Sequence, residues 1–185
     1  MLRWLLSALW ICVLTGTVTG AKVEVAGAPQ GISLNNDFTV KVRPEGKSKW
    51  VLVPTYLVKV DEVRETKHHV EHASMATFDF SEKVEIEVTY NKGKIDSARV
   101  RPLSYDIPFM IEGNTLQFSL EKPANLSVEV NGDIFHNLHL FANPLDTFKV
   151  DKKNPDLIYF GPRIHRFEGG EFRIPSGKTV YVAGG

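Results

Sequence analysis

The sequence is poor in cysteine and has no excess of charge of either sign. Cys12 is the only cysteine among 185 residues, and basic and acidic residues number 22 each. A single cysteine excludes an intramolecular disulfide, so stability has to come from a buried core. Binding to nucleic acid requires clustered lysine and arginine to neutralise phosphates, and no such tract occurs. We therefore expect no nucleic acid among the partners.

Long apolar runs are also scarce, and the conspicuous one lies at the N-terminus. Arg3 precedes a mainly apolar run from Trp4 to Leu14, and small and polar residues follow it. This order is typical of a secretory signal peptide, and the run is shorter than the ~20 residues that span a bilayer. The alternatives are a membrane anchor or a buried helix. We predict that residues 1–21 are cleaved, and that the protein is secreted (extracellular or periplasmic) without membrane attachment.

The rest of the chain is dominated by alternation of apolar and polar residues. Val84, Ile86, Val88 and Tyr90 share one face of a predicted strand, because side chains alternate across a sheet. Further strands are expected at 38–43, 49–60, 76–80, 97–103, 115–120, 126–130 and 137–142, with turn signals between them. This pattern predicts an antiparallel β-sandwich over residues 22–150.

Two segments depart from the regular alternation. Pro54 lies inside the run 49–60, so this run is two strands, a bulge or an edge strand. Residues 61–73 come closest to an amphipathic helix, but Val63 and Val70 alone make a thin apolar stripe. We interpret the histidine-rich part of this segment as a polar loop.

The pattern changes after residue 150. A polar connector precedes three short predicted strands at 157–160, 170–174 and 179–184. Strands this short and closely spaced are typical of one coil of a solenoid. We therefore place a separate unit at residues 151–185.

Two stretches resemble a known family: "NLSVEVNGDIFHNLHLFANPLD" from Asn125 and "DLIYFGPRIHRFEGGEFRIPSGKTVYVAGG" from Asp156. They are similar to the N-terminal region of secreted polygalacturonase-like glycoside hydrolases of family 28, and the two-part layout also resembles the family 49 dextranases. Arg163 stands where that pattern has a glycine. The resemblance implies an all-β fold, with an antiparallel β-sandwich followed by the first coil of a right-handed parallel β-helix.

The resemblance also implies a function. The sandwich would cap the β-helix of an enzyme that hydrolyses glycosidic bonds in a pectin-like polysaccharide, and it would meet that polymer through the β-helix. A single coil leaves its apolar face and strand edge uncovered. We therefore expect the chain to be a fragment, with an incomplete β-helix at 151–185. The alternative is a stand-alone secreted module that binds carbohydrate or is purely structural.

Catalytic residues of the family are not found. The resemblance implies Asn-x-Asp, Asp-Asp, Gly-His-Gly and Arg-x-Lys motifs, and only residues 35–37 match the letters of the first. Glu82, Glu85 and Glu87 are interpreted as a solvated strand face. Inverting hydrolysis needs two carboxyl groups about 6.5–9.5 Å apart, and nothing in the sequence indicates such a pair. We expect no catalytic residue in this chain, and we expect the fragment to be inactive.

The histidines raise the question of a metal site. His68, His69 and His72 surround Glu71, and these residue types can bind zinc, but the spacing matches no zinc motif. We expect no metal and no cofactor.

The remaining histidines have predicted structural roles. His136 and His139 flank Leu138 and are predicted to point to opposite faces of a strand. Asp133 is predicted to hydrogen-bond His136, and His165 is predicted to organise its own turn.

Sugar binding without catalysis needs exposed aromatic side chains. Trp50, Tyr56, Tyr105 and Phe109 are candidates, although the apolar run around Trp50 favours its burial. Asn125 begins an Asn-Leu-Ser glycosylation sequon, which matters only if the source organism glycosylates.

Overall fold

The structure is a computed structural model that describes residues 20–184. The predicted signal peptide, residues 1–21, falls almost entirely outside this range, so its cleavage stays a prediction. Within residues 20–184, no helix is long and apolar enough to cross a membrane. The described chain is all-β: a β-sandwich precedes a coil that contains a parallel strand pair, in agreement with the predicted fold class.

The strands of the sandwich follow one another with mostly short connections, and the longest connection is residues 25–37 between β1 and β2. They are β1 (Val23–Glu24), β2 (Phe38–Pro44), β3 (Val51–Val53), β4 (Thr55–Arg64), β5 (Lys67–Phe80), β6 (Val84–Tyr90), β7 (Ala98–Arg101), β8 (Phe109–Glu112), β9 (Thr115–Leu120), β10 (Ala124–Val130) and β11 (Asp133–Pro144). A short 3-10 turn, η1 (Leu103–Tyr105), lies between β7 and β8. The alternation of the sequence therefore predicted most strands at their observed places.

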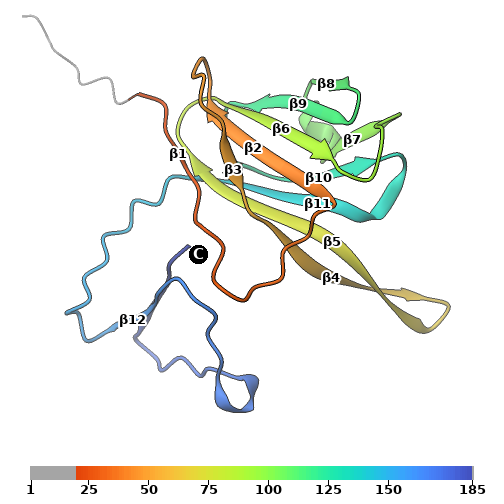
Figure 1. Ribbon diagram of the computed structural model, residues 1–185. Coiled ribbons are helices and arrows are strands. Elements are labelled where there is room, and N and C mark those ends of the chain that lie inside the picture. The colour runs from red at the N-terminus through yellow and green to blue at the C-terminus, as the bar shows by residue number, and fades with distance from the viewer. Residues whose placement is uncertain (1–19, 185) are drawn as a thin grey trace, which may run out of the picture.

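Two sheets pack face to face around one core (Figure 1). The five-stranded sheet has the order β3-β2-β6-β9-β8, and the six-stranded sheet has the order β1-β5-β11-β10-β7 with β4 also paired to β5. Alternate residues of both sheets are buried between them. This core includes Phe38, Val40, Val42, Val53, Phe78, Phe80, Ile86, Leu116, Phe118, Leu126, Leu138 and Leu140.

Pro54 marks the point where the chain changes sheet. β3 pairs with β2 in the five-stranded sheet, and β4 pairs with β5 in the six-stranded sheet. Proline lacks the N–H that a continuous ladder would need, so the run divides there. Of the three alternatives for this run, namely two strands, a bulge or an edge strand, the structure shows two strands.

One strand pair departs from a purely antiparallel sandwich. β11 runs parallel to β5, with Leu138 opposite Ser74 and Pro144 opposite Phe80. Strands joined by a tight turn are antiparallel, whereas strands this distant in sequence are free of that constraint. Local sequence patterns carry no information about such a pair.

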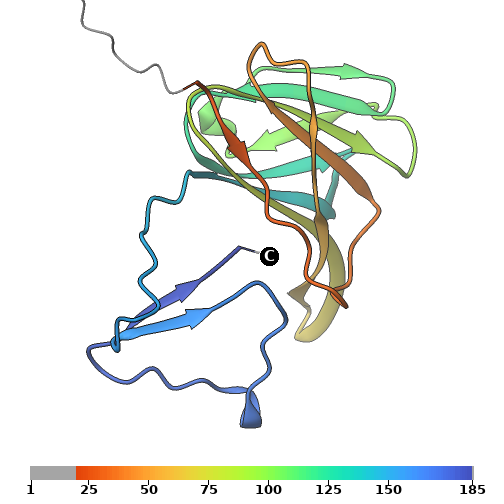
Figure 2. The same ribbon diagram turned by 60° about the vertical axis from the view of Figure 1, so that its left-hand side comes forward.

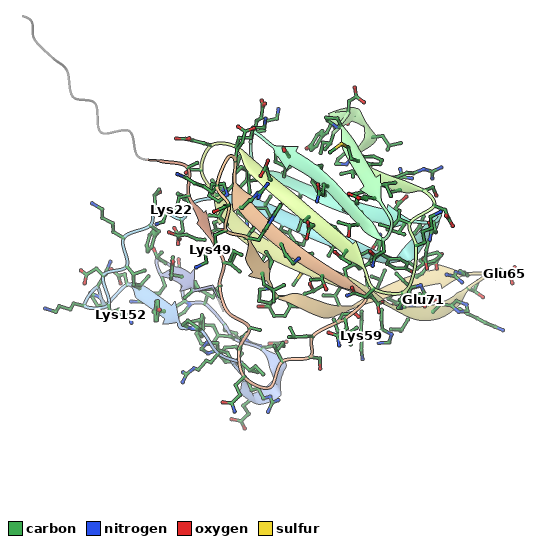
Figure 3. The ribbon with its side chains drawn as sticks, turned by 45° about the horizontal axis from the view of Figure 1, so that its top comes forward. Lys22, Lys49, Lys59, Glu65, Glu71 and Lys152 are labelled. Carbon is green, nitrogen blue, oxygen red and sulfur yellow. The ribbon has the colours of Figure 1, made fainter. Side chains whose placement is uncertain are left out.

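The interpretation of the histidine-rich residues 68–72 as a polar loop is wrong. They belong to β5, which pairs with β4 in a long hairpin that extends beyond the sandwich as an arm. Figure 3 shows Glu65 at its tip and Glu71 nearer the sandwich. Glu65 and Thr66 form the turn with φ of 47° and 70°, as a two-residue hairpin turn requires. Both faces of the arm are largely open to solvent, so its sequence lacks the alternation of apolar and polar residues that predicts a strand.

The C-terminal coil forms a sheet of its own. β12 (Leu157–Phe160) runs parallel to β13 (Thr179–Val182), with Tyr159 opposite Tyr181. Figure 2 shows this pair beside the sandwich and next to its N-terminal segment. The strand predicted at 170–174 is not formed. This stretch follows a 3-10 turn, η2 (Glu168–Gly170), and has no ladder partner in the part of the chain that the structure describes.

Candidate functional site

A groove of about 720 Å³ opens along the β8–β9 side of the five-stranded sheet. Strands β2, β6, β9 and β8 supply its floor, and the segment between η1 and β8 supplies one wall. The side chains that define it are Arg43, Trp50, Glu85, Tyr105, Phe109, Met110 and Gln117. We refer to this feature as the aromatic groove.

Strand alternation places the polar floor of the groove. Arg43, Glu85 and Ser119 lie opposite one another on β2, β6 and β9, while their neighbours Val42 and Ile86 are buried in the core. Such cross-strand rows bring side chains from distant parts of the sequence to within contact distance. The same pattern that builds the core therefore also builds the floor.

Trp50 lies at the rim and not in the core. The Arg43 guanidinium lies 4.2 Å from the centre of the Trp50 ring, and Arg43 Nε donates a hydrogen bond to Glu85. A cation over a tryptophan face is attracted by the ring, and this contact orders both side chains. The expected burial of Trp50 is wrong: Val51 and Val53 point inward, so alternation leaves Trp50 facing outward and half-buried.

The opposite wall comes from the connection between β7 and β8. Tyr105 ends η1 and is 53% exposed. Asp106 follows it with a left-handed φ of 47°, which turns the chain toward β8. On β8, Phe109 packs against the core, and Met110 is 72% exposed. The wall thus presents one aromatic ring and one flexible thioether side chain to the groove.

Three of the four predicted aromatic candidates meet in this groove. Trp50, Tyr105 and Phe109 all line it. Tyr56 lies instead on β4, opposite Met75, in the other sheet. Burial raises the pKa of Tyr56, but no lining residue of the groove contributes to that shift. Tyr56 is therefore separate from the site.

The formal charges that line the groove are balanced. Three basic and three acidic residues take part, and they are Arg43, Lys83, Lys122, Glu85, Asp106 and Glu121. Two of the bases are engaged: Arg43 with Glu85, and Lys83 with Glu45 at 2.7 Å. The hydrogen bond to Glu45, together with its attraction, raises the pKa of Lys83. The groove therefore offers many hydrogen-bonding groups without a net field of one sign.

The acidic candidates are in structural ion pairs. Glu85 and Glu87 lie on the outer face of β6, and Glu87 accepts a hydrogen bond from Lys41 at 2.9 Å. The interpretation of Glu82 as part of this strand face is wrong, because it lies in the preceding turn with φ of 60°. Residues 35–37 form a bend in which Asn35 donates to the Ser74 hydroxyl at 2.9 Å. None of these arrangements isolates a reactive carboxyl group.

The histidine-rich segment does not converge on one point. On β5, alternation turns His69 and Glu71 to one face and His68 and His72 to the other. His68 Nδ1 lies 2.8 Å from an Asp61 carboxylate oxygen on β4. Among residues 20–184, no three metal-ligating side chains are grouped as a metal site.

The predicted partner of His136 is confirmed. Its Nδ1 lies 2.9 Å from Asp133 Oδ2, and its Nε2 lies 3.4 Å from Glu71 on the neighbouring strand. Burial raises the pKa of Asp133, but the backbone N–H groups of His136 and Phe135 and the His136 ring outweigh it, so the net shift is downward. This cluster fixes the start of β11 against the arm.

The other two histidines also have structural surroundings. His139 lies on the face of β11 opposite the core residue Leu138, and burial lowers its pKa. His165 Nε2 lies 2.8 Å from the carbonyl oxygen of Gly161, which supports the predicted role in organising that turn.

Glu129 is an ionisable group that alternation failed to identify. It faces outward from β10, yet it is only 5% exposed and is paired with Arg101 on β7. Its Oε2 has no hydrogen-bond partner. The one feature of the sequence that could have indicated a buried Glu129 is Arg101, because a buried carboxylate usually pairs with an arginine on an adjacent strand.

Asn125 is exposed on β10. The sequon is therefore accessible to a glycosylating enzyme, and modification of Asn125 stays a prediction.

Comparisons with known proteins reveal a similarity in fold but no similarity in sequence to a known family. No family model matches the sequence, and no curated protein matches it. Among solved structures, the chain is similar to Dex49A from Penicillium minioluteum, with a TM-score of 0.58 and 12% sequence identity. The match covers 86% of this chain and 43% of that chain, so this chain spans less than half of the solved protein. The likeness shows that the two chains share a fold over the matched region, and no comparison bears on family 28.

Proposed function

We propose that this chain is the N-terminal accessory domain of a secreted enzyme that degrades a polysaccharide. The observation that carries the proposal is the likeness to Dex49A, which covers most of this chain but less than half of the solved protein. In this proposal the sandwich caps the first coil of a β-helix. The glycosidic bond is hydrolysed on later coils.

The exposed apolar side chains of the coil support this role. Phe167, Phe172, Ile174 and Val182 are exposed, although Phe160, Phe167 and Phe172 already pack edge to face or tilted against one another. A coil of a parallel β-helix buries such side chains against the next coil. The surface is therefore suited to stacking.

The contacts between the coil and the sandwich support capping. The Tyr181 ring stacks between Tyr159 and Phe148 at 5.9 and 5.1 Å, and the Tyr181 hydroxyl donates to Asp146 in the connector from β11. Gly184 approaches Ala26 so closely that an added Cβ would lie 3.0 Å from the alanine Cβ. The sandwich and its two flanking segments thus hold the coil on one side and leave the other side open.

Two observations bear on the substrate, and they favour different polysaccharides. The sequence resemblance implies a pectin-like polymer, and the likeness to Dex49A favours an α-glucan such as dextran. We propose hydrolysis of O-glycosidic bonds as the shared reaction. Residues 20–184 supply no paired aspartates for it, so this chain acts in positioning and protection of the β-helix.

Reading the gene beyond codon 185 and weighing the secreted protein tests this proposal. Additional coils with paired aspartates are expected, together with activity against dextran or polygalacturonan. A stop codon at this position, with a secreted protein of the matching mass and no activity, would contradict the accessory role. Retention of the protein inside the cell would contradict secretion separately.

A specific observation favours the stand-alone binding module as a second candidate function. The aromatic groove exists within the sandwich and needs no β-helix. Binding of polysaccharide by a chain that is shown to end at Gly185 would favour the module.

A further inference from the structure

We propose that the aromatic groove is a binding site for a segment of an uncharged polysaccharide. This inference deepens the proposed function, because it assigns the sandwich its own contact with the polymer. It does not depend on a catalytic β-helix, since every residue that lines the groove lies between Arg43 and Ala124.

The aromatic side chains give the groove its preference for sugar rings. Trp50 enters from the edge next to β3, and Tyr105 and Met110 enter from η1 and β8. Sugar rings have apolar C–H faces and polar hydroxyl edges, and ligand sites combine aromatic surface with a few fixed polar groups. Trp50 and Tyr105 supply that apolar surface at two places in one groove.

The polar floor is ordered before any ligand arrives. Glu85 and the Trp50 ring together hold Arg43, and Gln117 Nε2 donates to Glu87 at 3.0 Å. The Gln117 amide is therefore oriented, and its carbonyl oxygen is left to accept from a hydroxyl group. Groups that are already fixed lose little conformational entropy when a ligand binds.

The charge balance selects an uncharged polymer. The three basic and three acidic lining residues cancel, and Arg43 and Lys83 already have carboxylate partners. Among the lining bases only Lys122 lies outside these ion pairs, and a polyanion such as polygalacturonate would also meet the carboxylates of Asp106 and Glu121. Hydroxyl groups, in contrast, find donors and acceptors on the same floor.

The groove is separate from the coil. The coil contacts the segment after β1 at Ala26 and the connector after β11 at Asp146, and neither residue lines the groove. Figure 1 shows the coil and strands β8 and β9 on different sides of the sandwich. A polymer in the groove and a β-helix on the coil can therefore be present at the same time.

Tryptophan fluorescence tests the proposal directly. In the full chain with Trp4→Phe and Trp10→Phe, Trp50 is the only tryptophan, so its emission reports on the groove. Titration with dextran, soluble starch and hydroxyethyl cellulose is expected to give a saturable shift with at least one polymer. Polygalacturonate is expected to give none. Affinity electrophoresis in gels that contain the same polymers provides a second readout, which does not rely on Trp50.

Matched variants locate the binding site. Tyr105→Ala and Trp50→Ala are each expected to weaken binding about tenfold or more, since buried aromatic contacts dominate binding sites. Tyr56→Ala removes an aromatic residue from the other sheet and is expected to leave binding unchanged. Equal melting temperatures of the variants show that each one folds.

Several results would overturn the proposal. They are an absence of binding to all three uncharged polymers, equal losses in Tyr105→Ala and Tyr56→Ala, and tighter binding of polygalacturonate. Self-association that Trp50→Ala abolishes, without sugar binding, would instead identify a second copy as the occupant. Each of these results leaves the accessory-domain proposal intact, because that proposal is decided by the downstream coils.

Discussion

Removal of the Arg101 side chain is expected to destabilise the sandwich through Glu129. Glu129 is 5% exposed, and Arg101 is its ion-pair partner, with a side chain that is 40% exposed. One carboxylate oxygen of Glu129 already lacks a hydrogen bond, so Arg101→Met leaves a buried charge without compensation. Loss of one partner of a fully buried pair costs about 3–5 kcal/mol.

Solvent reduces this cost, because Arg101 is partly exposed and the attraction is screened there. We expect a loss of about 2–3 kcal/mol in the free energy of unfolding. For a chain of this size that corresponds to a fall of roughly 4–12 °C in Tm. Urea unfolding followed by far-ultraviolet circular dichroism measures the loss, and a thermal melt checks it.

Two further variants make the test specific. Arg99→Met removes an exposed arginine from the same strand, opposite Glu129 in register, and is expected to change stability by less than about 0.5 kcal/mol. The double variant Arg101→Met with Glu129→Leu removes both charges and is expected to recover most of the loss. The reasoning is refuted if Arg101→Met costs no more than Arg99→Met, or if the double variant is no more stable than Arg101→Met.

Three other predictions concern pH, the coil and the arm. Burial lowers the pKa of His139 in the folded protein below the ordinary histidine value of about 6.5. The free energy of unfolding is therefore highest above pH ~6.5 and falls as the pH decreases below that value, because the unfolded chain takes up the proton more readily. In His139→Gln, Tm should depend less on pH between about pH 7 and 5. Gly184→Val places a side chain against Ala26 and should weaken the packing of the coil on the sandwich by about 1–3 kcal/mol. The measurement is the rate of proteolysis after residue 144, which should increase. Gly27→Ala, at a position with open space around it, should leave this rate unchanged. Thr66→Gly relieves a φ of 70° at the hairpin turn and should raise the free energy of unfolding by about 1 kcal/mol, which corresponds to about 2–4 °C in Tm; an unchanged Tm would show that this backbone is unstrained.

The sequence predicted the sandwich well wherever one strand face is buried. Val84, Ile86 and Val88 show this, because burial of one face imposes period two on the residues. Asn131 and Gly132 form the turn between β10 and β11 with positive φ at both residues, as an Asn-Gly pair favours. The missing N–H of Pro54 likewise indicated that the strand run 49–60 is interrupted there. Where local rules decide the conformation, the prediction is confirmed.

The errors have a common physical origin. The arm around Val63 and Val70 has two solvated faces, so no burial pattern distinguished its strands from a loop. The parallel pairing of β5 with β11 and the burial of Glu129 depend on residues far away in sequence. Composition and periodicity describe neighbours along the chain, and they carry little information about contacts across it.

Sequence reasoning considered three aromatic residues of the candidate site, but neither its polar residues nor its geometry. Trp50, Tyr105 and Phe109 were named as sugar-binding aromatics, together with Tyr56. The strand order β3-β2-β6-β9-β8 separates the first three from Tyr56, and that order cannot be read from the sequence. The balanced charge of the groove likewise emerges only when six dispersed residues are brought together.

The parallel alignment of β11 with β5 constrains the order in which the molecule is assembled. During synthesis β5 appears early, yet one of its two long edges stays unsatisfied until residues 133–144 have left the ribosome. The nascent chain therefore has to remain open while roughly half the domain is added, a delay that favours handling by chaperones. Under the proposal that this protein is secreted, such postponed closure would be an advantage on an export route that carries unfolded chains.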